Sequence, residues 1–181
     1  DRFTQGKTRN CDLLKQLKDT SKQQAPFAVV VGCIDSRVPP EMVFDQRIGD
    51  IFAARIAGNF VNTDILGSLE FATQLAGAKL IVVLGHTECG AIKGAADNAK
   101  LGNLTAMLEN IRPSLKKLNY KGVPSSKDKE LVQKLADQNA KDAVEKILTK
   151  SQVINNLVAG GKVKVVSAMH DIGTGKITWL S

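Results

Sequence analysis

The sequence predicts a single α/β domain built around a mainly parallel central β-sheet flanked by helices. Its 181 residues (1–181) suit one domain, since single domains commonly contain about 100–200 residues. Three short runs rich in β-branched residues are apolar at nearly every position, as strands buried on both faces of a parallel sheet are. Helical patterns lie between these runs, and such alternation is typical of this fold class.

Four segments are expected to form the sheet. The three apolar runs are Phe27–Cys33, Lys79–Gly85 and Lys162–Ala168. A fourth candidate, Asp50–Ala57, is less regular. No repeat and no linker divides the chain, so all four belong to the same predicted domain.

Helices are expected before, between and after these strands. An N-terminal helical arm occupies residues 1–25, and the C-terminal third of the chain is helical. The expected helices are Asp12–Asp19, Thr63–Ala76, Gly90–Lys100, Asn103–Leu118 and Lys127–Val158. Residues 120–129 are expected to form a surface loop before the last of these helices.

Local signals refine three of the expected helices. Asn62 or Thr63 is a suitable N-cap for the second helix, and Gly77 a suitable stop. Pro113 is expected to kink or break the fourth helix. The fifth is expected to be interrupted near Thr149 and Ser151, and to end at Gly160-Gly161. The apolar face of the second helix comprises Ile65, Leu66, Leu69, Ala72, Leu75 and Ala76.

Composition excludes several classes of protein. Three cysteines are an odd and small number, which excludes a disulfide scaffold. The longest apolar runs have about six or seven residues, whereas a membrane-spanning helix needs about 20. The net charge of +7 comes largely from lysines interleaved with acidic residues, and only 4% of residues are aromatic. We therefore expect neither a nucleic-acid partner nor a membrane partner.

Candidate metal ligands follow two of the predicted strands. Cys33 ends one strand, and His86 and Cys89 come just after another. Ligands of parallel sheets bind beyond the carboxyl ends of the strands, so these three side chains are expected at one edge. Two thiolates and one imidazole suit Zn²⁺, and three protein ligands leave a position for water or substrate, as in catalytic sites.

Each candidate alone has a more ordinary interpretation. A single cysteine is usually a small buried apolar residue, and a lone histidine is usually a hydrogen-bonded one. The three candidates together at one sheet edge, with Asp35 and Arg37 beside Cys33, favour the metal site. Cys11 has no such neighbours and is interpreted as structural or incidental.

At these residues the chain resembles the β-class carbonic anhydrases. The resemblance is carried in order by Cys33-x-Asp35-Ser36-Arg37, Ala57-Gly58-Asn59 and Gly85-His86-x-x-Cys89-Gly90, and it extends from Arg2-Phe3-x-x-Gly6 to Asp171-Ile172-x-Thr174-Gly175. It implies a zinc enzyme that interconverts carbon dioxide and bicarbonate with zinc-bound hydroxide as the nucleophile. It also implies assembly into homodimers or dimers of dimers.

The resemblance also assigns roles to particular residues. Cys33, His86 and Cys89 match the ligands of one zinc ion per chain, and Asp35 with Arg37 matches the catalytic acid and base dyad. Gln24, Phe52 and Gly90 match residues that line the substrate pocket, with Phe52 contributed across a dimer interface.

Two positions depart from the pattern of similar enzymes. Some of these enzymes have a noncatalytic bicarbonate pocket, to which Arg55 could contribute, but Val30 occupies the position of its tryptophan. We therefore expect no bicarbonate switch and an Asp35-Arg37 pair that stays off the metal. His170 stands where relatives commonly have tyrosine; a hydrogen-bonded role and a proton-shuttle role are both open.

Two alternative functions and the compartment remain open at this stage. The same scaffold could hydrolyse carbon disulfide or carbonyl sulfide, or the chain could be a noncatalytic zinc-binding α/β module. The glycines near Gly85, Gly90 and Gly94 do not form a phosphate-binding loop, which argues against a nucleotide site. Cysteine ligands suit the cytoplasm, although the periplasm is the alternative if a leader has been removed before Asp1.

Overall fold

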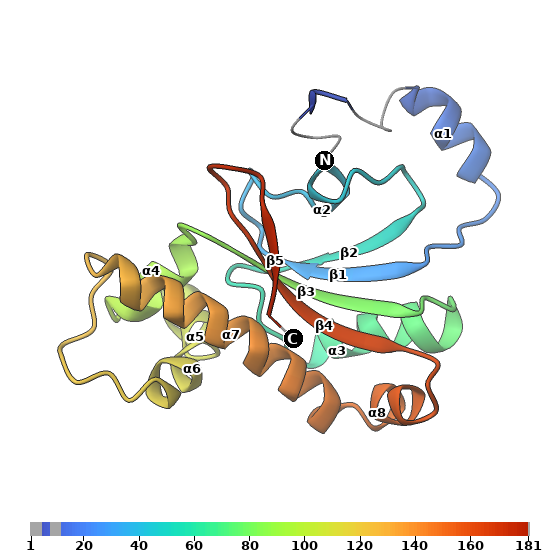
Figure 1. Ribbon diagram of the computed structural model, residues 1–181. Helices are drawn as coiled ribbons and strands as arrows, with labels where there is room; N and C mark the ends of the chain where they lie inside the picture. Colours follow the sequence, from blue (N-terminus) through green and yellow to red (C-terminus); the bar gives the residue numbers. More distant parts are fainter. Residues whose placement is uncertain (1–4, 8–11, 181) are drawn as a thin grey trace.

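A five-stranded sheet forms the centre of the protein (Figure 1). The computed structural model describes residues 5–7 and 12–180. The strands are β1 (Ala28–Gly32), β2 (Ile51–Arg55), β3 (Leu80–His86), β4 (Lys164–His170) and β5 (Ile177–Trp179), in the spatial order β2-β1-β3-β4-β5. The first four are parallel, and β5 is antiparallel to β4. The predicted α/β fold with a mainly parallel sheet is therefore confirmed.

The strands agree closely with the sequence patterns. Every residue of β1 is buried, as is every residue of β3 after Leu80, which explains why both runs lack the polar alternation of a one-sided sheet. The observed β3 and β4 both extend to a histidine, beyond the predicted ends at Gly85 and Ala168. The short strand β5 was not predicted, because three partly exposed residues give no periodic signal.

Helices cover the sheet and its carboxyl edge. They are α1 (Leu13–Thr20), α2 (Pro40–Val43), α3 (Thr63–Glu70), the π-helix η2 (Phe71–Leu75), α4 (Gly90–Ala96), α5 (Gly102–Leu108), α6 (Arg112–Lys117), α7 (Lys129–Lys150) and α8 (Gln152–Ala159). One apolar cluster joins β1 and β3 to α3, α7 and α8. A second cluster surrounds Cys33 and Cys89 with residues of α4 to α7, so both cysteines lie in an apolar environment.

The segment after Asn62 is helical, but its last turn differs from the prediction. The Asn62 side chain accepts a hydrogen bond from the N–H of Ile65 at 3.0 Å, which confirms Asn62 as the N-cap. The predicted burial of Leu75 is wrong, because its side chain is 76% exposed. The cause is η2, since a π-helical turn contains more residues than an α-helical turn and rotates the residues that follow it.

The two expected interruptions are present. Pro113 lies in the first turn of α6, so the predicted segment 103–118 is divided into α5 and α6. Ser151 ends α7 and begins α8, where its hydroxyl accepts from the N–H of Ile154 at 3.1 Å. A serine that caps the following helix thus fixes the predicted break.

In the described part of the N-terminal arm, the short helix α1 lies apart from the sheet in Figure 1. Only Gln16 of α1 is buried, and its side-chain oxygen accepts from the N–H of Ile48 at 3.0 Å. Leu13, Leu14 and Leu17 are each more than half exposed. Arg2, Phe3 and Cys11 lie outside the described residues. Within the described part of the chain, no helix is both long and apolar enough to cross a membrane.

A polar contact joins α6 to α7. Asp142 accepts hydrogen bonds from Ser114 Oγ at 2.6 Å, from Lys117 Nζ at 2.8 Å and from Gln138 Nε2 at 2.8 Å. Burial opposes ionisation of this carboxyl group, but the hydrogen bonds outweigh that effect and lower the pKa of Asp142. The ionised carboxylate therefore stabilises the folded chain.

We expect Asp142→Asn to lower the free energy of unfolding by about 1–2 kcal/mol at pH 7, because all three of these bonds are accepted by a charged carboxylate. The folded pKa of Asp142 is below its unfolded value, so this contribution is present above about pH 4 and is lost as the pH falls through the folded pKa. Urea denaturation of both proteins at pH 7, 5 and 3 measures the difference. A difference that stays constant over this range would contradict the assignment.

Candidate metal centre

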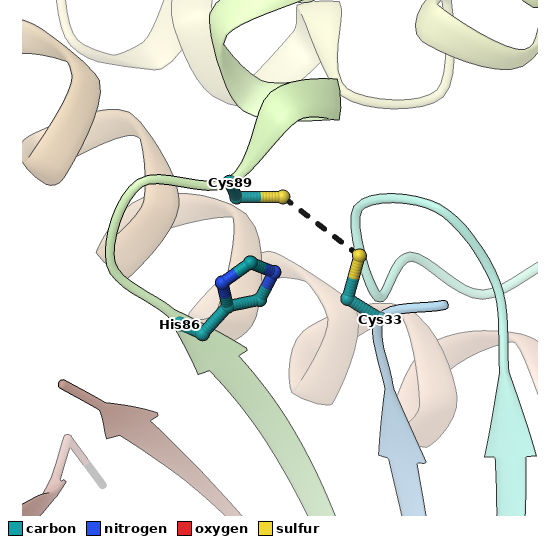
Figure 2. A group of neighbouring side chains, drawn as sticks. All are labelled: Cys33, His86 and Cys89. Carbon is teal, nitrogen blue, oxygen red and sulfur yellow. Dashed lines mark hydrogen bonds between the residues drawn. The ribbon is translucent and has the colours of Figure 1, made fainter. Parts of the chain in front are cut away.

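Three side chains converge at the carboxyl edge of the sheet (Figure 2). Cys33 follows β1, His86 is the last residue of β3, and Cys89 is the N-cap of α4. Because β1 and β3 are adjacent parallel strands, with Gly32 opposite Leu84, both chains leave the sheet at the same place. The potential ligand atoms all lie within 4.8 Å of one another. The structure therefore brings these three residues together, as the sequence predicts.

The imidazole of His86 is oriented by the backbone. Its Nδ1 lies 2.9 Å from the carbonyl oxygen of Thr87, and a carbonyl can only accept, so Nδ1 carries the proton. Nε2 then has a free lone pair. It is buried and has no hydrogen-bond partner among the described residues. A buried nitrogen without a partner is costly in an apolar environment, and a metal ion would satisfy it.

The two thiols influence each other strongly, with their sulfur atoms 3.9 Å apart. A hydrogen bond from Cys89 lowers the pKa of the Cys33 thiol to about 4; burial opposes this shift, and the N–H of Gly58, 3.4 Å from the sulfur, supports it. The same pairing and burial raise the pKa of Cys89. Without a cation, only one of the two thiols ionises readily, so a pair of thiolates requires a positive ion between them.

The donor set and its spacing fit zinc. Two sulfurs that each lie about 2.3 Å from a tetrahedral zinc ion are roughly 3.8 Å apart. The observed separation of Cys33 Sγ and Cys89 Sγ is 3.9 Å. A set of two sulfurs and one imidazole nitrogen is also the kind that leaves one position of a tetrahedral ion free.

Asp35 and Arg37 form a bidentate ion pair beside this group. Arg37 Nε donates to Asp35 Oδ1 at 2.9 Å, and Arg37 Nη2 donates to Asp35 Oδ2 at 2.7 Å. The Arg37 side chain, followed by its backbone N–H, holds the pKa of Asp35 well below its usual range despite some burial. Asp35 Oδ2 is 4.0 Å from His86 Nε2, so an ionised carboxylate faces the ligand group.

Arg55 fixes the loop that carries Cys33 and Asp35. From β2, its Nε donates to the carbonyl of Cys33 at 2.8 Å, and its Nη2 donates to the carbonyl of Asp35 at 2.7 Å. The planar guanidinium presents two N–H donors in a fixed arrangement to the two carbonyls, whereas the donors of a lysine are on a single rotating ammonium group. The sequence raised Arg55 only as part of a bicarbonate pocket, and its contact with the Cys33 loop was not anticipated.

Of the three residues that the resemblance assigns to the substrate pocket, only Gly90 lies at the three predicted ligands. Gly90 is the first residue of α4, next to Cys89, and it is exposed at the site. Gln24 is exposed and precedes β1, at the opposite end of that strand from Cys33. Phe52 pairs in register with Val29, four residues before Cys33. Within one chain, the structure does not bring Gln24 and Phe52 to the three predicted ligands.

Phe52 instead belongs to an open hollow at the edge of the sheet. This hollow has a volume of about 620 Å³ and lies between β2 and α3. The ring of Phe71 stands edge-on to that of Phe52, with centroids 6.3 Å apart, and Phe71 is 50% exposed. Phe52 is itself half-buried and also packs against the apolar cluster that joins β1 and β3 to α3, α7 and α8.

His170 lies close to the three predicted ligands, but among the described residues its side chain makes no hydrogen bond to them. It ends β4 opposite His86, and its carbonyl accepts from the N–H of Thr87 at 3.0 Å. The side chain is buried, and its Nδ1 has no partner among the described residues. Burial and the neighbouring His86 lower the pKa of His170, so its ring is neutral at neutral pH.

Sequence comparison places this chain among known proteins. A family model described as carbonic anhydrase matches residues 28–177. Carbonic anhydrase 2 of Mycobacterium tuberculosis is 32% identical over 158 residues, which cover 84% of this chain and 73% of that protein. A carbonic anhydrase of Mycolicibacterium smegmatis is 33% identical over 162 residues, which cover 87% of this chain and 76% of the relative.

Solved structures agree with the sequence comparison. A β-carbonic anhydrase of Aspergillus fumigatus superposes with a TM-score of 0.81 at 28% identity, over 92% of this chain and 80% of that chain. A tetrameric β-carbonic anhydrase of Sordaria macrospora has a TM-score of 0.80 at 27% identity, over 91% of this chain and 85% of that chain. The β-carbonic anhydrase of Coccomyxa, in complex with acetazolamide, has a TM-score of 0.82 at 26% identity, over 92% and 77%.

We expect Arg55→Met to lower the free energy of unfolding by about 2 kcal/mol, because it leaves two carbonyl groups of the Cys33 loop without their charged donor. Arg47→Met is a matched control, because Arg47 Nη2 lies 4.0 Å from Asp19 Oδ2 in an exposed ion pair. We expect it to lower the free energy of unfolding by about 0.5 kcal/mol. Urea denaturation of both variants tests this. Equal losses in the two variants would show that the Arg55 contacts contribute little.

Proposed function

This chain belongs to the β-class carbonic anhydrase family, and we propose that it interconverts carbon dioxide and bicarbonate at a zinc ion held by Cys33, His86 and Cys89. The observation that carries the zinc assignment is the buried, unpartnered Nε2 of His86 beside two sulfurs 3.9 Å apart. When bound, zinc supplies hydroxide at moderate pH by lowering the pKa of water.

Asp35 and Arg37 are proposed to act next to the metal. Arg37 holds both carboxylate oxygens of Asp35, which keeps Asp35 ionised and directed at the site. Each carboxylate oxygen has a second lone pair, so Asp35 Oδ2 can still accept a hydrogen bond from the nucleophile. An acceptor fixed in this way would orient the remaining lone pair of the nucleophile towards carbon dioxide.

The contacts of Arg55 and Arg37 support an enzyme without a bicarbonate switch. Arg55 is engaged by the carbonyls of Cys33 and Asp35, and so is not free to hold a bicarbonate ion by itself. Val30, at the position of the tryptophan of switching enzymes, is buried in β1. The bidentate contact with Arg37 occupies both carboxylate oxygens of Asp35 and would keep Asp35 off a bound metal.

The substrate pocket is proposed to form between two copies of the chain. Gln24 precedes β1, and Phe52 pairs with Val29 near the start of β1, whereas Cys33 follows the other end of that strand, so only a second copy could bring them to the site. Phe71, whose ring stands against that of Phe52, and Leu75 of the same π-helical segment are at least half exposed, and the leucines of α1 add further exposed apolar surface. A homodimer, or a dimer of such dimers, would cover these residues.

Metal analysis tests the zinc assignment. We expect purified protein to contain about one zinc ion per chain and to hydrate carbon dioxide in a stopped-flow pH-indicator assay. Cys33→Ala should lose most of its zinc and its activity, because two ligands hold the ion poorly. Cys11→Ala is the control, since Cys11 is outside the proposed ligand set, and should retain both.

Two results would contradict this proposal. Native protein without zinc would exclude the metal site. Zinc-containing protein without hydration activity would favour a noncatalytic zinc module, or, if it hydrolysed carbon disulfide or carbonyl sulfide in the same apparatus, a different substrate on the same scaffold.

A mixed dimer tests the shared pocket. If Phe52 acts on the site of the partner subunit, a dimer of one Cys33→Ala chain and one Phe52→Ala chain contains one intact site. We expect the purified mixed dimer, isolated with two affinity tags, to have about half of wild-type activity, since dimeric sites of this kind are related by two-fold symmetry. Each variant alone should be much less active. Mixed dimers no more active than the mean of the two variants would contradict a shared pocket.

A further inference from the structure

We propose that Asn139 of α7 is a positioning residue for the metal centre: it holds Gly58 so that the Gly58 N–H donates to the sulfur of Cys33. The inference rests on the proposed zinc site. It adds a residue that is distant in sequence from the three ligands and touches none of them directly.

Asn139 is an unusual residue at its position in α7. Its side chain is 2% exposed, on a helix face whose other buried members near it, Ala136, Ala140 and Ala143, are apolar. Its Nδ2 donates to the carbonyl oxygen of Gly58 at 2.8 Å. A buried amide among alanines costs free energy unless it is paired, and this pairing joins α7 to the loop after β2.

Gly58 connects Asn139 to the metal centre. Its carbonyl accepts from Asn139, and its N–H donates to Cys33 Sγ at 3.4 Å. Both groups are attached to the same Cα. The backbone φ angle of Gly58 is +82°, a value that residues other than glycine rarely adopt. A Cβ on Gly58 would lie 2.6 Å from Ile111 Cδ1 and 3.2 Å from Ala91 Cβ, so the site also requires glycine for space.

Gly58 by itself would not keep its N–H directed at the sulfur of Cys33. It has more conformational freedom than any other residue, so the N–H of Gly58 could turn away from the sulfur if only its neighbours in sequence restrained it. The bond to Asn139 restrains the carbonyl on the other side of the same Cα. Because α7 is a 22-residue helix that packs on β3 and β4, it provides a fixed support for that bond.

The N–H of Gly58 matters because the sulfur of Cys33 is buried. Cys33 is 4% exposed, so water cannot replace a lost hydrogen bond to its sulfur. A donor directed at the sulfur stabilises the thiolate, which is the form that binds zinc. Partners that orient and polarise a metal ligand typically contribute about 10–100-fold to metal affinity or activity.

Zinc affinity and the cobalt spectrum test the proposal. In Asn139→Leu, a side chain of similar size lacks the donor, and we expect zinc to bind about 10-fold more weakly in competition with a chromogenic chelator. The cobalt-substituted variant should also show a shifted sulfur-to-cobalt charge-transfer band, because the electron density on Cys33 Sγ changes. A change that affected stability alone would leave this band unmoved.

Asp142→Asn is the matched control. Asp142 lies three residues from Asn139 on α7 and lines the same cavity of about 250 Å³, but it accepts its hydrogen bonds from residues of α6 and α7. We expect it to lower stability without changing zinc affinity or the cobalt band. If Asn139→Leu does not fold, as judged by circular dichroism, Asn139→Ser takes its place, since the serine hydroxyl is too short to reach Gly58.

The outcomes separate this proposal from the zinc assignment. Wild-type zinc affinity and an unchanged cobalt band in a folded Asn139 variant would overturn the role of Asn139. Equal losses of affinity in Asn139→Leu and Asp142→Asn would also overturn it, because the effect would then be one of stability. Wild-type protein that binds neither zinc nor cobalt would instead remove the metal site itself.

Discussion

The burial of two sulfur atoms and one imidazole nitrogen within 4.8 Å of one another is the constraint on which the rest of the site depends. Cys33 and Cys89 are members of an apolar cluster, where a thiolate is far less stable than in water. Moving two like charges into such surroundings costs several kcal/mol per ion unless a counter-ion is present. Metal binding and the packing of α4 to α7 around the cysteines are therefore coupled, as is usual for buried metal sites.

Groups from elements far apart in the sequence keep these ligands in place. Arg55 of β2 holds the carbonyls of Cys33 and Asp35, and the carbonyl of Thr87 selects the His86 tautomer. The N–H of Thr87 in turn donates to the carbonyl of His170 at the end of β4. Cys33 and His86 are thus held through backbone groups, and those groups are held in turn by neighbouring strands. This arrangement explains why the site requires the whole parallel sheet rather than a short ligand-bearing loop.

The sequence predicted the parts of this arrangement that are local or periodic. Continuous apolar runs identified β1 and β3, and Ser151 and Pro113 marked real helix boundaries. The convergence of Cys33 with His86 and Cys89 followed from the rule that parallel strands share a carboxyl edge, and their roles came from the family resemblance.

The features that the sequence did not reveal depend on contacts between distant residues. The exposure of Leu75 depends on a π-helical turn that helical periodicity does not reveal, and β5 is too short to have a pattern. The contacts of Arg55 and Asn139 are with backbone carbonyls, which are the same at every position of a sequence. A polar residue on the buried face of α7 was the one available signal for Asn139, and by itself it does not identify a partner.

The same geometry divides the proposed site into two parts with different requirements. All three predicted metal ligands come from one chain, and so do Arg55 and Gly58, so the proposed metal site is complete within a folded monomer. Gln24 precedes β1 and Phe52 lies near the start of β2, and the aromatic pair of Phe52 and Phe71 faces an open hollow beside an edge strand. A sheet edge with exposed aromatic rings is unfavourable in a monomer and favourable in a symmetric dimer. In the proposed enzyme the metal ligands thus lie within one subunit, whereas Gln24 and Phe52 would line the substrate pocket only after assembly, so metal binding would not depend on the dimer but the complete pocket would.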